Sequence, residues 1–361
     1  LFWWFNQGAD VHLAVTPKPH YGADGSKAFD VQSYPQEWAE WIVTKLGPFP
    51  FPSFWGPKAG LPCTEWIARC AAEALLDGSP PRELTLVYLP HLDYEPQRVG
   101  PKQCDWKKIV GELDAACEPI LDAAKKTGAA VWIVNEYTHV DVDRPIYLNR
   151  LLREKGWLSA RDGPFGEQLE TYASRAFAVC DHQVAHVYVK NLADASEVRD
   201  LIAVQTGVDR VYLGDERAPI GLDHARAGDL VVLAKPNAWF AYPFWLDDRR
   251  APDYARTVDI HRKPGYDPCE LFLDPQLLFP MGRAVTKLLL KKAGLRTLID
   301  VIPLDASLVK GSHGIRIENP LDRPVFIGTG VAPGDPTVPQ TSIRERILEH
   351  FGIADSVAAR F

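Results

Sequence analysis

Short apolar runs alternate along this chain with longer segments of helical periodicity. Residues 84–90 and 129–134 are apolar almost throughout, and neither run alternates with polar positions. Runs of this kind predict central strands that are covered on both faces. The first five residues, Leu-Phe-Trp-Trp-Phe, are apolar as well and predict a further buried strand. The alternation is typical of an α/β fold, in which helices flank a sheet.

The longest periodic segment lies between two of these apolar runs. Residues 105–127 repeat apolar side chains at helical spacing and end at Gly128, a residue type that favours helix C-termini. A strand, a helix and a second strand in this order predict a right-handed parallel crossover. Three further helices are expected, at 64–76 (with Thr64 as N-cap), 275–293 and 342–351. The predicted fold class is therefore a doubly wound, mostly parallel sheet flanked by helices.

The middle of the chain has a different pattern. Its apolar runs are short and separated by turn residues, with one short helix at about 195–206. The strands expected here lie at 176–179, 185–189, 211–213 and 230–233. We interpret residues 161–243 as a smaller α+β insertion. The chain then divides into a first part of the α/β domain at 1–160, this insertion, and a C-terminal part of the α/β domain at 244–361.

Composition and charge narrow the class of partner. The chain has 361 residues and a formal net charge of -7, without a run of Lys or Arg, which argues against binding a nucleic-acid polymer. No stretch approaches the ~20 apolar residues of a membrane span. The six cysteines are irregularly spaced, so we expect reduced, mostly buried thiols rather than disulfides or a thiolate zinc site. We expect a cytoplasmic protein that has no membrane partner.

Two carboxylates follow the apolar runs. Asp93 comes after the run at 84–90, and Glu136 comes after the run at 129–134. Ligands of open parallel sheets gather at the carboxyl ends of strands, where such side chains can hold a divalent cation. The alternative is that Asp93 begins a turn and Glu136 caps a local segment. Either residue taken alone fits both interpretations.

Two later loops carry groups suited to an anion or a metal. His261 and Lys263 flank a Pro-Gly turn that precedes Asp267, and this loop is able to meet a phosphate, although a solvated charged loop has the same pattern. Further on, His313 stands between Ser312 and Gly314 in a Gly-Ser-His-Gly segment. Glycine lets the backbone approach closely, which suits a histidine aimed at a metal.

The remaining histidines and aromatic residues give weaker indications. His91 and His139 lie beside the predicted strand ends, and His91 is a candidate for substrate binding together with Asp267. His182, His186 and His224 belong to the insertion and could fill a pocket, although His186 alternates with apolar neighbours and suits a structural role. Trp55 lies in the aromatic segment 51–57, which either lines a pocket for a flat leaving group or belongs to the core.

Three motifs together resemble those of a known family. Residues 88–101 contain Asp93 and end in Gly-Pro, and they resemble an Asp-x-x-x-His segment that precedes Gly-Pro in that family. Residues 135–138 fall at its Ser-Asp-His-Gly motif, and residues 310–314 resemble its late Gly-x-His-Gly motif. In order and spacing, residues 1–315 are similar to the nucleotide pyrophosphatase/phosphodiesterase branch of the alkaline phosphatase superfamily.

The resemblance implies two divalent metal ions, typically zinc, that activate a Thr or Ser nucleophile. Asp93 and His313 would then serve one metal and Glu136 the other. Gln97 and Tyr137 stand at positions where the family carries histidine ligands, so manganese or magnesium is an alternative to zinc. The family's nucleophile strand has no counterpart in this chain, which begins at Leu1 within an apolar run. We therefore expect the nucleophile to lie outside the chain.

These expectations define a metal-dependent phosphoester hydrolase that acts on a small phosphoester by in-line phosphoryl transfer. The chain as given, without a nucleophile, is expected to be inactive. Two alternatives remain open: a non-catalytic protein that binds a phosphate ligand in the same fold, and a transferase that moves a phosphoryl group to an alcohol. The sequence indicates neither the natural substrate nor the oligomeric state.

Overall fold

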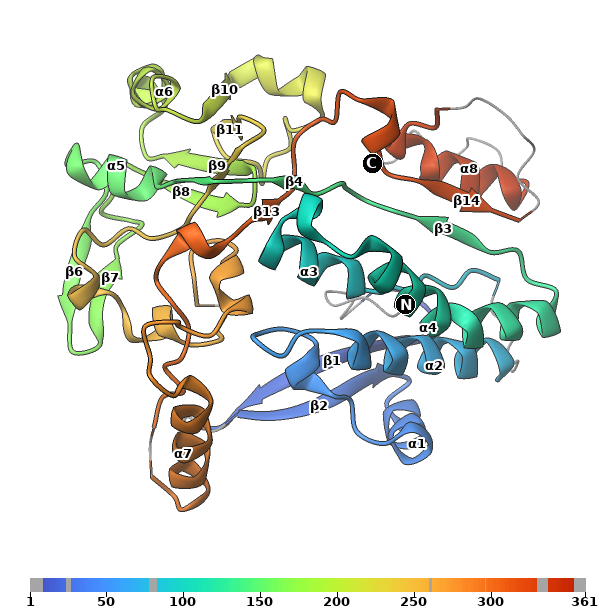
Figure 1. The fold of residues 1–361 in the computed structure, drawn as a ribbon. Coiled ribbons are helices and arrows are strands. Elements are labelled where there is room, and N and C mark those ends of the chain that lie inside the picture. The colour runs from blue at the N-terminus through green and yellow to red at the C-terminus, as the bar shows by residue number, and fades with distance from the viewer. Residues whose placement is uncertain are drawn as a thin grey trace.

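The computed structural model describes residues 9–23, 27–77, 83–259, 262–295, 297–329 and 337–353. The strand expected at 1–5 and the candidate residue His261 lie outside these ranges. The described residues form an α/β molecule of helices and several small sheets, as the sequence predicts for the class (Figure 1).

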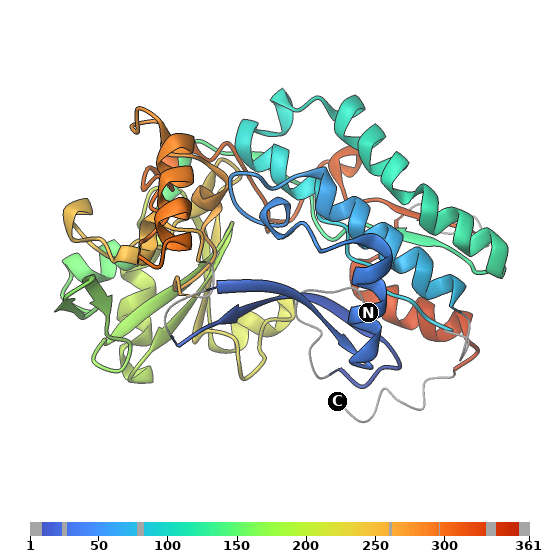
Figure 2. The same ribbon diagram turned by 90° about the horizontal axis from the view of Figure 1, so that it is seen from below.

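Three helices form one layer of the molecule. α2 (Leu61–Leu76) and α4 (Trp106–Thr127) run side by side, and α3 (His91–Val99) lies at one end of them (Figures 1 and 2). α4 begins as predicted, since the Asp105 side chain accepts a hydrogen bond from the Lys108 amide at 3.0 Å, and it ends at Gly128 with a positive φ of 73°.

The start of α2 differs from the prediction. The helix begins three residues before Thr64, with proline in its first turn, so that Thr64 is a fully buried interior residue rather than an N-cap. Proline favours the first helical turn because its missing N–H would have no intrahelical partner there. The predicted start of the helix was therefore too late by three residues, because threonine often caps helices and Thr64 suggested a start there.

A long hairpin lies against the helical layer (Figure 2). β1 (Ala14–Tyr21) and β2 (Lys27–Tyr34) pair antiparallel, and α1 (Glu37–Leu46) follows. Their apolar faces share a core with α2, to which the aromatic segment around Phe49 and Phe54 contributes. The space left beside Phe49 and Phe54 amounts to about 10 Å³, so these two rings belong to the core, whereas a pocket wall at Trp55 stays a prediction.

The middle of the chain forms the largest sheet. β8 (Ala176–Asp181), β9 (Val184–Val189), β11 (Leu230–Ala234) and β10 (Val208–Leu213) are antiparallel in the order β10-β11-β9-β8. α6 (Ala195–Ala203) precedes β10, and α5 (Leu148–Glu154) lies near β8. The strands and the helix expected from the apolar pattern are thus present. β6 (Ala160–Gly163) and β7 (Gly166–Leu169) form a separate hairpin.

Shorter strand pairs join distant parts of the chain. β5 (Arg144–Ile146) pairs parallel with β12 (Ala238–Phe240), whereas β4 (Val140–Asp141) pairs antiparallel with β13 (Gly311–Ser312). β3 (Trp132–Val134) pairs antiparallel with β14 (Phe326–Gly328). Two helices complete the fold, α7 (Pro280–Lys292) and α8 (Ile343–His350), both close to their predicted positions.

Two strand predictions need correction. Residues 84–90 form no strand element in the described part of the chain, because only Val87 and Leu89 pack against the core while Leu84 and Leu86 stay exposed. The second run does form β3, but Ile133 is 44% exposed and the partner of β3 is β14. The parallel crossover expected between the two runs is therefore not observed among the described residues.

The cysteines behave as predicted. All six are free thiols, and Cys63, Cys70, Cys180 and Cys269 are buried. Within the described ranges, no helix combines the length and the apolar character that crossing a bilayer requires.

Candidate metal centre

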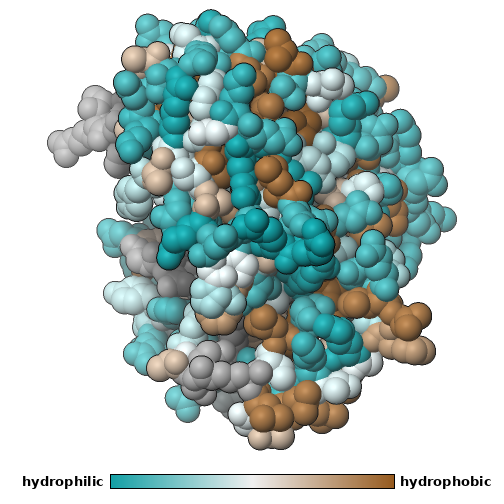
Figure 3. All heavy atoms as spheres, turned by 90° about the vertical axis from the view of Figure 1, so that its left-hand side faces the viewer, coloured by the Kyte–Doolittle hydropathy of each residue, from teal (hydrophilic) through white to brown (hydrophobic). Residues whose placement is uncertain are grey.

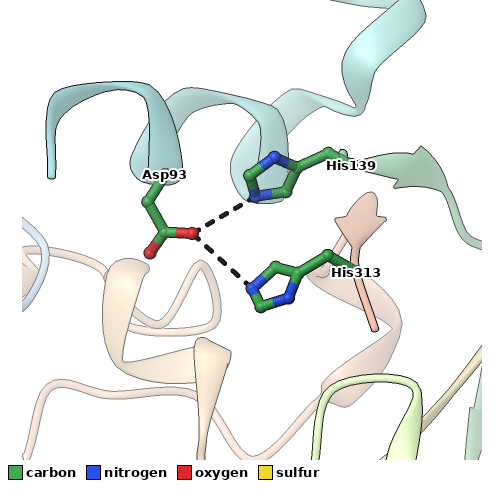
Figure 4. Close-up of side chains that lie close together, drawn as sticks. All are labelled: Asp93, His139 and His313. Carbon is green, nitrogen blue, oxygen red and sulfur yellow. Dashed lines mark hydrogen bonds and ion pairs between the residues drawn. The ribbon is translucent and has the colours of Figure 1, made fainter. Parts of the chain in front are cut away.

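Three elements bring one carboxylate and two histidines together (Figure 4). Asp93 lies in the first turn of α3, His139 directly precedes β4, and His313 directly follows β13. β4 and β13 pair with Gly311 opposite Asp141 and Ser312 opposite Val140, so the same register places His313 opposite His139. The strand pair therefore presents both imidazoles at one end, toward the helix that carries Asp93.

Glycine at position 311 allows the strand pair to approach α3. A Cβ atom there would lie 2.1 Å from the carbonyl oxygen of Pro96, a residue of α3, which no side chain tolerates. A backbone hydrogen bond of 2.9 Å from the Lys310 amide to the Gln97 carbonyl fastens the two segments together. The close contact of backbone with backbone thus sets the distance between Asp93 and His313.

Asp93 Oδ1 is the focus of the cluster. His139 Nε2 lies 3.3 Å and His313 Nε2 lies 3.7 Å from this oxygen, as the dashed lines of Figure 4 mark. The Tyr137 hydroxyl donates a hydrogen bond to the same oxygen at 3.0 Å. All three side chains, Asp93, His139 and His313, are largely shielded from solvent. The ligand atoms of the three residues all lie within 4.8 Å of one another.

The protonation states suit cation binding. Burial raises the pKa of Asp93, but the hydrogen bond from His139 and the influence of His313, His139 and Tyr137 outweigh it, and the net pKa lies below the usual value. Burial lowers the pKa of His313 well below its usual value. Near neutral pH the site therefore holds a carboxylate and a neutral His313 imidazole, the forms that bind metals.

Tyr137 is a hydrogen-bond donor to Asp93 in this structure. Burial, and after it the charge of Asp93, raises the pKa of its hydroxyl, so the phenol stays protonated and acts as a donor. Its ring stacks on His313 with a centroid distance of 3.6 Å and an angle of 8° between the planes. Tyr137 thus contacts all three clustered residues, since its ring also lies edge-on to His139 at a centroid distance of 5.5 Å. Its role as a ligand stays a prediction.

The donor set fits one divalent cation. A carboxylate oxygen and two imidazole nitrogens are ligands that zinc prefers, and tetrahedral coordination at 2.0–2.1 Å places neighbouring ligand atoms about 3.3 Å apart. The observed separations of 3.3 and 3.7 Å from Asp93 Oδ1 are close to that spacing before any adjustment. No Lys or Arg forms an ion pair with Asp93 among the described residues, so a cation is the natural counter-charge.

Two expected ligands do not enter this cluster. Glu136 is exposed, and its carboxylate does not belong to the group formed by Asp93, His139 and His313. Partial burial, followed by the charge of Asp93, raises its pKa. Gln97 is fully buried, and its Nε2 donates to the Asp93 carbonyl one turn earlier in α3 at 3.0 Å. Its amide nitrogen thus contacts the backbone of α3, whereas its buried Oε1 has no hydrogen-bond partner among the described residues, and its role as a ligand stays a prediction.

The residues proposed for phosphate or substrate lie in a buried ion network. The Lys263 ammonium is fully enclosed and contacts Asp267 at 2.6 Å and Glu270 at 2.7 Å. The Trp55 indole donates to the other oxygen of Glu270 at 2.6 Å. This enclosure favours a structural role for Lys263, Asp267 and Trp55. His91 contacts Glu112 of α4 at 3.0 Å and joins two helices.

Two histidines gain importance from the structure. His139 is the third member of the cluster, and the sequence carries one sign of it: in an extended segment Tyr137 and His139 point to the same face. His182 lies in the turn between β8 and β9, where it contacts His313 with ring centroids 3.7 Å apart. Burial and His139 lower the pKa of His182 to about 3. No sequence signal connects positions 182 and 313.

Fold and site together define an α/β protein with a buried carboxylate-and-imidazole centre suited to a divalent cation. A family model described as type I phosphodiesterase / nucleotide pyrophosphatase matches residues 1–267, more than half of the chain. The chain belongs to this family, as the sequence motifs predict. Among curated proteins, none matches the chain significantly.

Two solved structures illustrate the similarity to known folds. Phosphonoacetate hydrolase from Sinorhizobium meliloti 1021, in complex with phosphonoformate, has 17% identity and a TM-score of 0.40 over 58% of this chain and 48% of that chain. Murine ectonucleotide pyrophosphatase/phosphodiesterase 5 has 14% identity and a TM-score of 0.36 over 50% of this chain and 45% of that chain. The chain thus spans about half the length of the solved structures that it matches.

Proposed function

We propose that this protein is a metal-dependent phosphoester hydrolase in which Asp93, His139 and His313 hold a divalent cation. The observation that carries the proposal is the convergence of their three ligand atoms within 4.8 Å of one another. Family membership supports phosphoester chemistry, since the family is described by phosphodiesterase and pyrophosphatase activity. Zinc is the cation that a carboxylate with two imidazoles favours. A second metal ion served by Glu136 stays a prediction.

A cation held here would stabilise negative charge on the phosphoryl oxygens of a bound substrate. Several residues of the chain would hold and orient the ligands of this cation. Asp93 supplies the one charged ligand, and the Tyr137 hydroxyl fixes that carboxylate by donating to Oδ1. His313 is held between two rings, so its imidazole has one orientation. Burial excludes water from Asp93 and both histidines, which strengthens their interaction with charge.

The substrate class follows from the family and from the charge of the site. We expect a small phosphoester, in keeping with a net charge of -7 that disfavours a nucleic-acid polymer. One solved structure of murine ectonucleotide pyrophosphatase/phosphodiesterase 5 is of an inactive variant in complex with AMP, which is a small phosphate monoester. Inorganic phosphate and bis(p-nitrophenyl) phosphate are therefore suitable first probes.

The test is an assay of the zinc-loaded full-length protein. We expect zinc-dependent release of p-nitrophenol from bis(p-nitrophenyl) phosphate, abolished in Asp93→Ala and retained in His20→Ala, which changes an exposed histidine. Zinc-dependent binding of phosphate without turnover would favour the alternative of a non-catalytic binding protein. Transfer to added alcohols at the expense of hydrolysis would favour a transferase. Neither binding nor turnover in the zinc-loaded protein would contradict the proposal.

A further inference from the structure

A continuous column of aromatic rings passes through the candidate metal centre. Tyr137 stacks on one face of His313 at 3.6 Å, and His182 covers His313 at 3.7 Å with planes inclined by 33°. Tyr266 lies next to His182 at 4.2 Å, and Trp55 lies next to Tyr266 at 5.1 Å. The His313 ring thus lies against the Tyr137 ring and against the His182 ring of the β8–β9 hairpin.

The hairpin is fixed to His313 by its backbone as well. The amide of Gln183, the residue after His182, donates to the carbonyl oxygen of His313 at 2.9 Å. The Gln183 side chain is fully buried and donates to the carbonyl oxygen of Ala238 at 2.9 Å. Within the turn, His182 Nδ1 lies 3.5 Å from the hydroxyl of Ser312. The β8–β9 hairpin therefore contacts the His313 segment through a backbone hydrogen bond, the Ser312 hydroxyl and the His182 ring.

The turn conformation of His182 is unusual. Its φ is +54°, the only positive φ at a non-glycine residue among those described. Such a conformation is uncommon outside glycine, and it persists where the surroundings hold it. Gly265 packs directly against the base of this turn. A Cβ atom at position 265 would lie 2.4 Å from the carbonyl oxygen of Cys180, so only glycine allows this contact. The loop that carries Tyr266 thus presses against the hairpin and behind the His182 ring.

We propose that His182 is a positioning residue, whose ring holds the imidazole of His313 in the orientation that binds the metal. This inference rests on the proposed metal centre and adds the β8–β9 hairpin to it. Neighbours that orient a ligand typically change metal affinity by about 10–100-fold when they are removed. The ring face, rather than a nitrogen of His182, carries this role, because the stacked geometry is the contact that the two residues make.

Two substitutions separate this role from the alternatives. His182→Asn removes the ring but keeps a residue type that tolerates positive φ, whereas His182→Phe keeps a ring and removes both nitrogens. Co²⁺ is the probe, because its visible absorption reports the ligand set of the bound ion. Affinity is measured by titration of the full-length protein, with His224→Asn, an exposed histidine of the same part of the chain, as the matched control. Thermal unfolding without metal shows whether each variant is folded.

The proposal expects His182→Phe and His224→Asn to bind Co²⁺ with nearly the wild-type affinity and spectrum, and His182→Asn to bind about ten-fold more weakly or worse. Equal loss in both His182 variants, with an altered spectrum in His182→Phe, would make His182 a ligand and overturn the positioning role. Unchanged affinity in His182→Asn would overturn it as well. Absence of Co²⁺ binding by the wild type would instead refute the metal centre itself. Should His182→Phe not fold, unchanged affinity in His182→Asn would still overturn the positioning role.

Discussion

At the scale of single residues, the site depends on one oxygen atom that has three partners. Asp93 Oδ1 accepts a hydrogen bond from Tyr137 and lies near both imidazoles. Because His313 is neutral, its attraction for this carboxylate in the absence of metal is modest. The Tyr137 hydroxyl and the His139 imidazole are therefore the groups that hydrogen-bond Asp93 before a cation arrives.

This arrangement predicts a specific effect of Tyr137→Phe. The ring can keep its stack on His313, but the donor to Asp93 is lost, so zinc affinity should fall about ten-fold with unchanged stoichiometry. Competition with a chromophoric chelator measures the affinity. The matched control is Tyr172→Phe, at a tyrosine that is 94% exposed. Equal affinities of Tyr137→Phe and the wild type would show that the hydroxyl does not position Asp93.

A second residue-scale prediction concerns Lys263. Lys263→Met leaves Asp267 and Glu270 buried without their counter-charge, so the free energy of unfolding should fall by about 3–5 kcal/mol. Zinc stoichiometry of the folded variant should not change, since Lys263 does not belong to the cluster around Asp93. Denaturant unfolding, beside the exposed control Lys125→Met, measures the difference. A stable Lys263→Met variant that fails to act on phosphoesters would restore a role for Lys263 at the phosphate.

At the scale of elements, the packing of β13 against α3 sets the geometry of the site. Gly311→Ala would drive the strand away from Pro96, which should cost about 1–3 kcal/mol and weaken zinc binding. The control is Gly111→Ala within α4, where a Cβ atom meets nothing within 4 Å, and which should stabilise the protein by about 0.5–1 kcal/mol. Thermal unfolding and zinc titration of both variants test this. Unchanged zinc affinity in Gly311→Ala would show that the contact does not set the site.

The attachment of α7 depends on pH. Partial burial raises the pKa of Asp300, but hydrogen bonds from Arg283 and Lys287 of α7 outweigh it and lower the pKa to about 2. Because the folded-state pKa lies below the unfolded one, this contribution is present above about pH 4 and is lost as the pH falls toward 2. The protection of α7 amides, measured relative to the intrinsic exchange rate at each pH, should therefore fall over that range, and Asp300→Asn should accelerate their exchange at neutral pH. Identical exchange in Asp300→Asn and the wild type would contradict this.

The elements also show which parts of the fold the sequence determines locally. The helix at 105–127 was predicted almost to the residue, because its periodicity, its Asp105 cap and its terminal glycine all lie within the segment. The structure of the apolar runs at 84–90 and 129–134 was harder to predict, because a strand also depends on a partner strand that the local sequence does not specify. β3 finds its partner in β14, about 190 residues later, which no local pattern indicates.

The same distinction applies to the site. Asp93 and His313 were predicted from local features, a carboxylate after an apolar run and a histidine beside a glycine. His139 and His182 were not assigned, because their proximity to His313 depends on the register of β4 with β13 and on the docking of the β8–β9 hairpin. The burial of Lys263 with Asp267 and Glu270 was not predicted, since it cannot be inferred from a loop of mixed charge.

At the scale of the whole molecule, segments far apart in sequence meet at the site. α3, the strand pair β4–β13 and the β8–β9 hairpin each supply a residue, so the centre exists only in the assembled fold. The division of the chain at 161 and 243 stays a prediction. Apolar side chains also gather at the lower end of the molecule, where α7 lies (Figures 1 and 3), with Leu278 92% and Phe279 79% exposed.

The most direct test of the account is the zinc content of the purified full-length protein, measured by elemental analysis after dialysis. Wild type, His139→Ala and His20→Ala are compared, because His139 is the proposed ligand that the sequence motifs do not predict and His20 is exposed. The account predicts at least one equivalent of zinc in the wild type and in His20→Ala, and one equivalent fewer in His139→Ala. Wild-type zinc content in His139→Ala, or no zinc in any of the three, would contradict it.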